Sequence, residues 1–233
     1  MLKGKIIDLS QEIYTGMPVY PGHLKTVVWT HMSHDECARQ LGTGFSYETR
    51  GILLCDHGPT HIDSVSHLSR EPDAESIDQL ALEKCITEGV CIDVSDIERK
   101  TQFGRAKIES ELEKYEQDIL PGDTVLFFTA HYDRYYGEPE YMTDYPGLDR
   151  EATEWIIDKG AVNFGVDSPS PDMWYDKSYP CHSVCGERGV THVENLCNLD
   201  KLVGRRFTFI ALPLKIRDGT GSPLRAVAIL QEG

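Results

Sequence analysis

Short runs of apolar residues, many of them alternating with polar ones, predict that most of this chain folds into strands. Val, Ile, Thr and aromatic residues dominate the runs, and Gly, Pro, Asp or Asn separate them. The uninterrupted run Thr-Val-Leu-Phe-Phe-Thr is typical of a strand buried on both faces. Strands are expected at residues 5–9, 26–30, 85–94, 124–129, 162–167, 206–214 and 225–230, with a further alternating stretch at 45–49 and a hairpin-like turn at 218–221.

Helical periodicity is clear in two segments. Ile108, Leu112 and Tyr115 are spaced by four and three residues, which predicts one helix around them. Asp149 is a suitable N-cap for a second helix, which should end before Gly160. Strands with a few interspersed helices predict an α/β fold that is rich in β-structure. The length of 233 residues suits a single domain that spans 1–233.

Composition and charge narrow the possible partners. The hydrophobic fraction of 40% and the charged fraction of 26% are ordinary for a globular protein. The net charge of −15 argues against nucleic acid and against an anionic membrane, because both attract basic surfaces. No apolar run approaches the roughly 18 residues of a membrane helix, and residues 1–8 lack the apolar core of a signal peptide. We therefore expect a cytoplasmic protein.

The seven cysteines fit that location. They are odd in number and irregularly spaced, which favours free thiols in a reducing compartment over a disulfide framework. Cys181 and Cys185, with His192 nearby, resemble half of a zinc site, but the chain has no second Cys pair of this kind.

The stretch 55–67, Cys-Asp-His-Gly-Pro-Thr-His-Ile-Asp-Ser-Val-Ser-His, carries the most specific chemistry. His57, His61, Asp63 and His67 are separated by even numbers of residues, so an extended chain would point all four side chains to one face. A helix would separate them, and the proline at 59 disfavours a helix interior. Imidazole and carboxylate ligands together suit zinc, manganese or iron. The spacing therefore predicts an extended or turning segment that holds a divalent metal.

A metal held in this way favours hydrolysis. With open positions it activates water and polarises a carbonyl, which is what cleavage of an amide, lactam or lactone requires. His67 has two possible roles, since a neutral imidazole can move protons between water and the leaving group and can also serve as a fourth ligand.

The same stretch resembles the signature H-x-G-T-H-x-D-x-P-x-H of the cyclase-like metal-dependent hydrolases, a family that includes bacterial kynurenine formamidase and isatin hydrolase. The three His, the Thr and the Asp match, whereas Pro59 replaces a glycine and Val65 replaces a proline. These two departures concern backbone shape more than metal binding. Further similar segments occur in the family's order at residues 7–10, 18–22, 122–126, 165–168, 194–200, 211–214 and 221–225.

The resemblance implies a swivelling β/β/α fold and a homodimer or homotetramer. It implies a divalent metal, zinc or manganese, with one or two ions per chain. The first site would use His57, His61 and Asp63, and His67 would be the general acid/base. In the formamidase branch, a His and a Glu twelve residues apart help to hold a second metal, which corresponds here to His182 and Glu194. His192 is a rival to His182, because it lies two residues before Glu194.

The expected reaction is hydrolysis of a small amide, either an aryl formamide such as N-formylkynurenine or a cyclic amide such as isatin. Aromatic side chains line the pocket in branches of the family, and the candidates here are Tyr20, Trp29, Phe45 and Tyr47. Residues 167–170 could donate hydrogen bonds to an oxyanion. Two alternatives remain open: a lactonase or dehydrating cyclase on the same metal site, and a non-catalytic module that binds a metal or a ligand.

Overall fold

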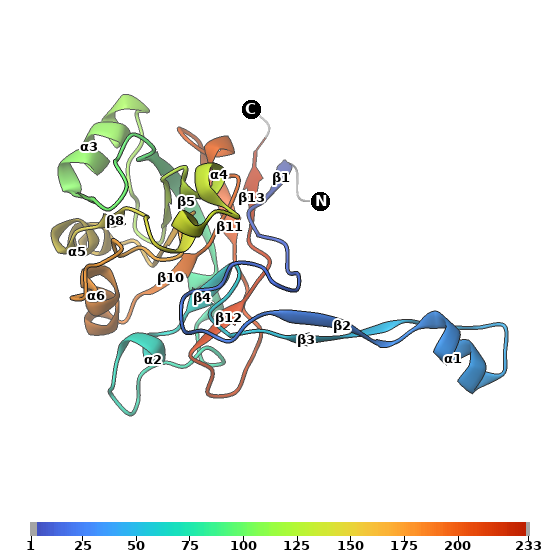
Figure 1. Cartoon of the computed structure of the whole chain (residues 1–233). Coiled ribbons are helices and arrows are strands. Elements are labelled where there is room, and N and C mark those ends of the chain that lie inside the picture. Colours follow the sequence, from blue (N-terminus) through green and yellow to red (C-terminus); the bar gives the residue numbers. More distant parts are fainter. Residues whose placement is uncertain (1–3, 232–233) are drawn as a thin grey trace.

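A nine-stranded mixed sheet, curled into a half-barrel, forms the centre of the molecule (Figure 1). The computed structural model describes residues 4–231. The α/β, β-rich class expected from the sequence is confirmed. From one edge to the other, the strands are β1 (Lys5–Asp8), β13 (Val227–Leu230), β11 (Arg206–Ile210), β5 (Ile86–Asp93), β7 (Thr124–Phe128), β9 (Asn163–Val166), β10 (Thr191–Glu194), β4 (His61–Asp63) and β12 (Gly221–Pro223).

The middle of the sheet is parallel, and helices make its connections. Strands β5, β7, β9 and β10 pair in parallel, so the chain must cross over between them. The crossovers contain α3 (Arg105–Lys114), α5 (Arg150–Asp158) and α6 (Pro180–Arg188). All three helices lie on the same side of the sheet (Figure 1). The strands on either side of this parallel centre pair antiparallel.

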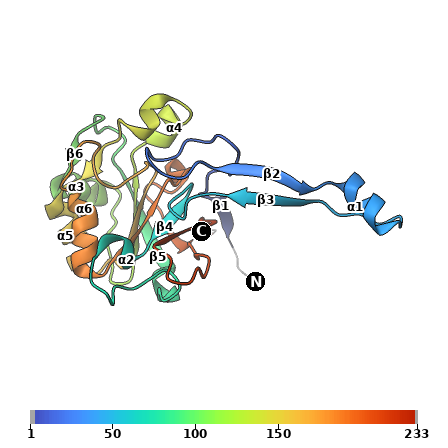
Figure 2. The same cartoon turned by 60° about the horizontal axis from the view of Figure 1, so that its bottom comes forward.

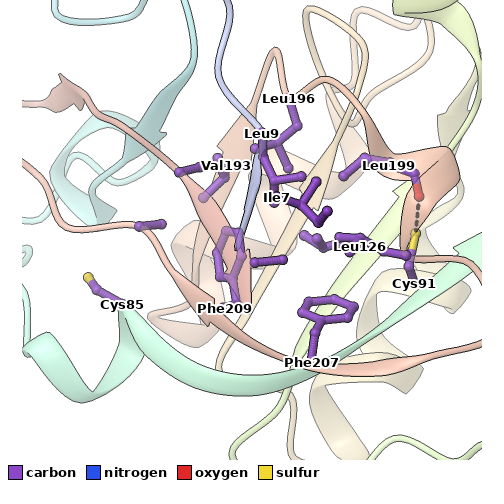
Figure 3. Packing of buried hydrophobic residues seen from close by; sticks show 14 of the residues in the cluster. Ile7, Leu9, Cys85, Cys91, Leu126, Val193, Leu196, Leu199, Phe207 and Phe209 are labelled. Carbon is purple, nitrogen blue, oxygen red and sulfur yellow. Dashed lines mark hydrogen bonds between the residues drawn. The ribbon is translucent and has the colours of Figure 1, made fainter. Parts of the chain in front are cut away.

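The alternation of side chains along the strands divides the buried residues into two cores. On β7, Val125 and Phe127 pack in the core beneath the helices, whereas Leu126 packs in the core on the opposite face. Figure 3 shows the second core, where Phe207 and Phe209 of β11 lie near Ile7 and Leu9. A strand buried on both faces explains why the run at 124–129 is apolar throughout.

A two-stranded arm projects from the body (Figures 1 and 2). It consists of β2 (Val27–Met32) and β3 (Thr49–Leu53), which pair with each other, and it carries α1 (His34–Leu41) at its tip. A capping box between Ser33 and Glu36 starts α1. Gly42, at φ 62°, ends the helix in the left-handed conformation that glycine adopts without strain.

The remaining elements are short. They are α2 (Val65–Leu68), α4 (His131–Tyr135), the two-residue strands β6 (Gln102–Phe103) and β8 (Gly147–Leu148), and the 3₁₀ turns Leu82–Lys84, Pro139–Met142 and Leu199–Lys201. In the part of the chain that the structure describes, none of the helices has the length and apolar character needed to cross a bilayer.

Several features differ from the sequence-based expectation. Of the alternating stretch 45–49, only Thr49 lies in a strand, at the start of β3. The turn at 218–221 does not join the last two long strands directly, because β12 follows it and pairs with β4. The segment from 55 to 67 is not extended throughout: only His61–Asp63 is a strand, and His67 lies on the single turn of α2. The four polar side chains therefore converge through turns as well as through the alternation of a strand.

Candidate active site

A cavity of about 300 Å³ opens where β4 and β10 meet α2 and α6. Its walls combine imidazoles, carboxylates and amides with a few apolar and aromatic side chains. They comprise Gln11, Pro18, Val19, Tyr20, His23, His57, Gly58, Pro59, His61, Asp63, His67, Met142, Pro169, Ser170, Tyr179, His182, Glu194 and Asn195.

Strand pairing brings four of the polar groups together. In the antiparallel register of β4 and β10, His61 is opposite Glu194, and Asp63 is opposite His192. The intervening residues of both strands, Ile62 and Val193, point into the core on the far face. The four polar side chains therefore share the face that the helices cover, although such residues are costly to bury without partners.

The first group of candidate ligands centres on Asp63. His57 Nδ1 lies 2.8 Å from Asp63 Oδ1. His61 Nε2 lies 3.3 Å from Asp63 Oδ1 and 3.3 Å from Glu194 Oε2. The predicted set of His57, His61 and Asp63 is thus brought together by the fold.

The second group involves the other oxygens of the same two carboxylates. His182 reaches in from α6, with Nε2 3.8 Å from Asp63 Oδ2 and 3.6 Å from Glu194 Oε1. His192 Nε2 lies 3.4 Å from Asp63 Oδ2 and 3.2 Å from Glu194 Oε1. The two histidines that the sequence left as rivals therefore lie in the same cluster with Asp63 and Glu194. Asp63 belongs to both groups, and its atoms also lie close enough to those of His57 and His67 to share a metal with them.

Outer hydrogen bonds set the tautomers of three of these rings. His61 Nδ1 lies 2.9 Å from the Pro59 carbonyl, and His182 Nδ1 lies 2.5 Å from Asp172 Oδ2; both oxygens can only accept. His57 Nε2 lies 2.9 Å from Thr220 Oγ1, whose own proton goes to Asp56. Each ring thus carries its proton on the outer nitrogen, and the lone pair of the inner nitrogen faces the carboxylates.

This arrangement fits a divalent cation. Lone pairs on imidazole nitrogens repel carboxylate oxygens at these distances unless a positive charge lies between them. The side chains of His61, Asp63, His192 and Glu194 are almost fully buried, so water screens the repulsion poorly. His192 Nδ1 is a buried nitrogen without a hydrogen bond of ordinary geometry among residues 4–231, and the Cys185 thiol is the polar group that interacts with this ring. Imidazole and carboxylate donors of this kind suit zinc or manganese.

The pKa values also show that the site favours positive charge. Burial alone would lower the pKa of His61, but Asp63 and Glu194 outweigh burial and raise it to about 10. Burial would raise the pKa of Glu194, but His192 and His61 lower it to about 2. The pKa of Asp63 also lies well below its usual value, because the surrounding imidazoles outweigh burial. The fold thus stabilises ionised carboxylates beside imidazoles that need a proton or a metal.

His67 differs from the other histidines. Its side chain is 34% exposed and lines the cavity, and its Nε2 lies 3.8 Å from Asp63 Oδ2. Its ring lies 3.9 Å from the ring of His57. Burial, together with the neighbouring His57 and His182, lowers its pKa to about 4 despite the attraction of Asp63. The ring is therefore neutral near pH 7 and able to accept a proton.

The proposed aromatic contacts divide between cavity and arm. Tyr20 lines the cavity. Trp29, Phe45 and Tyr47 lie on the arm or its tip and do not line the cavity of their own chain, because the arm leads away from the body. Trp29 instead covers Gly51 on the neighbouring strand, where a Cβ atom would come within 2.1 Å of the ring. Within one chain, Tyr20 therefore lies at the cavity and the other three do not, and substrate contact by these residues stays a prediction.

The predicted oxyanion donors at 167–170 are largely engaged elsewhere. Asp167 is buried and accepts hydrogen bonds from the amide and hydroxyl of Thr129. The Ser168 hydroxyl donates to the carbonyl of Ser170, whose own hydroxyl accepts from the amide of Asp172.

Several residues of the site were not anticipated. Gln11, His23 and Asn195 line the cavity, and Asp172 orients His182. Asp172 lies ten residues before His182, and no periodicity connects the two. Asn195 directly follows Glu194, but neighbouring residues of a strand normally point to opposite faces. The sequence therefore contained no pattern that would have selected these residues.

The chain is similar to named proteins over almost its whole length. The chain is 28% identical to a kynurenine formamidase of Bacillus cereus over 222 residues, which is 95% of each chain. It is 26% identical to a kynurenine formamidase of Salinibacter ruber over 231 residues, or 95% of this chain and 96% of the relative.

Solved structures are similar to the chain over almost its whole length as well. Isatin hydrolase A of Labrenzia aggregata, bound to benzyl benzoate, superposes with a TM-score of 0.85 at 25% identity and covers 98% of this chain and 94% of its own. Isatin hydrolase A of Ralstonia solanacearum superposes with a TM-score of 0.84 at 26% identity, and the match covers 97% of this chain and 92% of its own. The model of the family described as "Putative cyclase" matches residues 7–173, well over half of the sequence. The chain therefore belongs to this cyclase family.

Proposed function

We propose that the protein is a metal-dependent amidohydrolase that acts on a small, non-peptide amide. The substrate would be an aryl formamide such as N-formylkynurenine or a cyclic amide such as isatin. One observation carries the proposal: the outer hydrogen bonds of His57, His61 and His182 turn the inner lone pair of each ring toward Asp63 and Glu194. Histidines that donate outward from one nitrogen and turn the other toward a shared centre are typical of metal ligands.

Zinc or manganese fits the donor set, as one ion or two. His57, His61 and Asp63 would hold the first ion, and His182 and Glu194 with the shared Asp63 would hold the second. His192 faces the same oxygens and would add a ligand there. When bound, the metal supplies Lewis-acid polarisation of the carbonyl and activation of water.

The protein's own groups would manage the protons. His67 faces the cavity and is neutral near pH 7, so it would take a proton from the attacking water and return it to the leaving nitrogen. A cavity of about 300 Å³ lies at the small end of ligand pockets and suits a substrate with a single aromatic ring.

Turnover of defined substrates tests this function. The purified protein, after chelation and dialysis, is assayed with N-formylkynurenine and with isatin, in the absence of metal and with added zinc or manganese. We expect metal-dependent hydrolysis of at least one of the two. Hydrolysis of a simple aryl lactone but of neither amide would favour a lactonase. Tight metal binding with no turnover of any of the three would favour a binding module.

We also propose that the arm holds the protein in a homodimer or homotetramer by packing on a second copy of this chain. Phe45 and Ile52 on the arm are 65% and 56% exposed, and an isolated two-stranded ribbon is at best marginally stable in water. Residues 26–54 contain two arginines and three carboxylates, which makes the arm nearly neutral beside a chain of net charge −15. Because the arm is apolar and nearly neutral, a second copy of this acidic chain would repel it less than it would repel the rest of the surface.

The molar mass in solution tests the assembly. One chain has a mass of 26.3 kDa. Light scattering should give two or four times that mass for the wild type, and a smaller species for a Phe45→Ser/Ile52→Ser double variant. A wild-type mass of one chain at micromolar concentration would contradict the proposal.

A cytoplasmic location is consistent with the thiols. All seven cysteines are free in the structure, which a reducing compartment would maintain. Titration of protein unfolded without reductant should detect seven thiols, and a reproducibly lower number would argue against the cytoplasm.

A further inference from the structure

Asn195 occupies an unusual position next to the candidate metal ligands. It follows Glu194 at the end of β10, and its φ of 58° lies in the left-handed region, which is costly for most residues other than glycine. This turn of the backbone allows Glu194 and Asn195, although adjacent, to line the same cavity. Two hydrogen bonds hold the backbone of Asn195 in this turn. The Asn195 amide donates to the Ser168 carbonyl at 3.0 Å, and the Asn195 carbonyl accepts from Thr60 Oγ1 at 2.6 Å.

A buried chain of hydrogen bonds fixes the orientation of the Asn195 side chain. Gln11 Nε2 donates to the Tyr141 hydroxyl at 2.6 Å, and that hydroxyl donates its proton to Asn195 Oδ1 at 2.7 Å. Tyr141 is fully buried, and its ring stacks on His131 at an angle of 19°. Gln11 is anchored as well, because its backbone amide donates to Thr60 Oγ1 at 2.9 Å.

The direction of these hydrogen bonds leaves one donor of the Asn195 side chain available. Because Asn195 Oδ1 is the acceptor from Tyr141, its other side-chain atom is the amide nitrogen Nδ2. Nδ2 has no acceptor among residues 4–231, and it is not among the atoms sealed from solvent without a partner. Asn195 is 7% exposed and lines the cavity, so the open side of this amide faces the place where a substrate binds.

The geometry points to Asn195 as a further catalytic residue, whose Nδ2 donates a hydrogen bond to the carbonyl oxygen of the amide as negative charge develops on it. Tyr141 is a positioning residue, because it acts only through the orientation of Asn195, and Gln11, which also lines the cavity, orients Tyr141. The inference rests on the proposed function. A preoriented neutral donor stabilises an oxyanion without reorganisation, and a neutral donor does not compete with a cation for the carboxylates. Of the serines expected from the sequence as donors, Ser168 already donates to the Ser170 carbonyl, whereas the Ser170 hydroxyl is engaged only as the acceptor from the Asp172 amide.

Kinetics of two variants test the inference on the zinc- or manganese-loaded protein. Asn195→Ala removes the donor, and kcat should fall about 100-fold to 1,000-fold while KM changes little, because the bond strengthens in the transition state. Tyr141→Phe keeps the ring and the donor but frees the amide to rotate, so kcat should fall less, by about 10-fold. Tyr136→Phe is the matched control: its ring packs on Tyr141 and its hydroxyl faces Tyr14, and it should leave kcat unchanged.

A binding measurement gives a readout that does not depend on turnover. Calorimetry compares phenylphosphonate, a tetrahedral oxyanion, with benzamide, a planar neutral amide. Asn195→Ala should weaken phenylphosphonate binding about 10-fold or more and leave the affinity for benzamide within about twofold. Metal content and melting temperature are measured on the same samples.

Three results would overturn the role of Asn195. They are an unchanged kcat in Asn195→Ala, an equal loss of affinity for both ligands, and a loss of activity that parallels a loss of metal. If the wild type hydrolyses no amide, the proposed function fails, and the phosphonate comparison still decides whether Asn195 is an oxyanion donor. If Asn195→Ala does not fold, Tyr141→Phe decides the matter. A lower kcat at unchanged KM in this variant would support the inference, and an unchanged kcat would overturn it.

Discussion

At the scale of single residues, His67 is the histidine to which the account gives proton transfer, whereas it gives metal binding to the others. It faces the cavity and is neutral near pH 7, whereas the other imidazoles of the cluster face carboxylates more closely. His67→Gln should lower kcat by about 100-fold to 10,000-fold, the usual contribution of a general acid/base. Metal content and melting temperature should stay at wild-type values. A variant that kept full turnover with metal bound would exclude this role, and one that lost its metal would make His67 a ligand.

The local spacing in the sequence was sufficient to find the candidate ligands that lie close together in the chain. His61 and Asp63 share a face because they are two residues apart on β4. His57 and His67 reach the same place by turns that the even spacing did not describe. Asp172, Gln11 and Asn195 come from distant segments, and their roles depend on hydrogen bonds made only in the folded chain. No local pattern encodes such contacts.

At the scale of elements, the buried strands and two helices were predictable because their apolar spacing is regular. Helix α6 was missed, although it carries His182: it begins at Pro180 and contains Gly186, and its buried residues include two cysteines that were read as possible ligands. Helix α1 was missed although Ser33 and Glu36 form a recognisable capping box. The arm was not foreseen, since residues 26–30 were expected to form an ordinary strand and the alternating stretch 45–49 lies almost wholly outside β3.

The N-cap of α5 gives a prediction at this scale. Asp149 Oδ1 accepts a hydrogen bond from the amide of Ala152 at 2.7 Å. Asp149→Ala should cost about 1 kcal/mol of stability, which lowers the melting temperature by about 2–4 °C in a protein of this size. Asp149→Ser keeps an acceptor and should recover most of the loss. Equal melting temperatures for the Ala variant and the wild type would show that the cap contributes nothing.

At the scale of the whole molecule, the charges of the site couple metal binding to stability and pH. In the metal-free protein, His61 has a pKa of about 10 against an ordinary 6.5, so its stabilising effect is complete below pH 6.5 and disappears as the pH rises toward 10. Glu194 has a pKa of about 2 against an ordinary 4.5, so its effect is present above pH 4.5 and disappears as the pH falls toward 2. The metal-free site is thus most stabilising between pH 4.5 and 6.5.

A metal takes the place of the site's protons, so its effect should grow with pH. At about 100 times its dissociation constant, a bound metal adds about 2.7 kcal/mol, or about 5–10 °C in melting temperature. Zinc or manganese should raise the melting temperature of chelator-treated protein more at pH 8 than at pH 5.5, because fewer protons must be displaced. An equal or larger rise at pH 5.5 would contradict the assignment of these imidazoles as ligands.

The central claim is that this cluster is a metal site with a separate acid/base residue, and elemental analysis tests it most directly. The wild type, Asp63→Asn and His67→Gln are purified without added metal, and their metal per chain is measured. Asp63 belongs to both groups of ligands, so we predict that the wild type and His67→Gln contain one or two zinc or manganese ions and that Asp63→Asn contains little of either. Background levels in a folded wild type, or equal metal in the wild type and Asp63→Asn, would contradict the account.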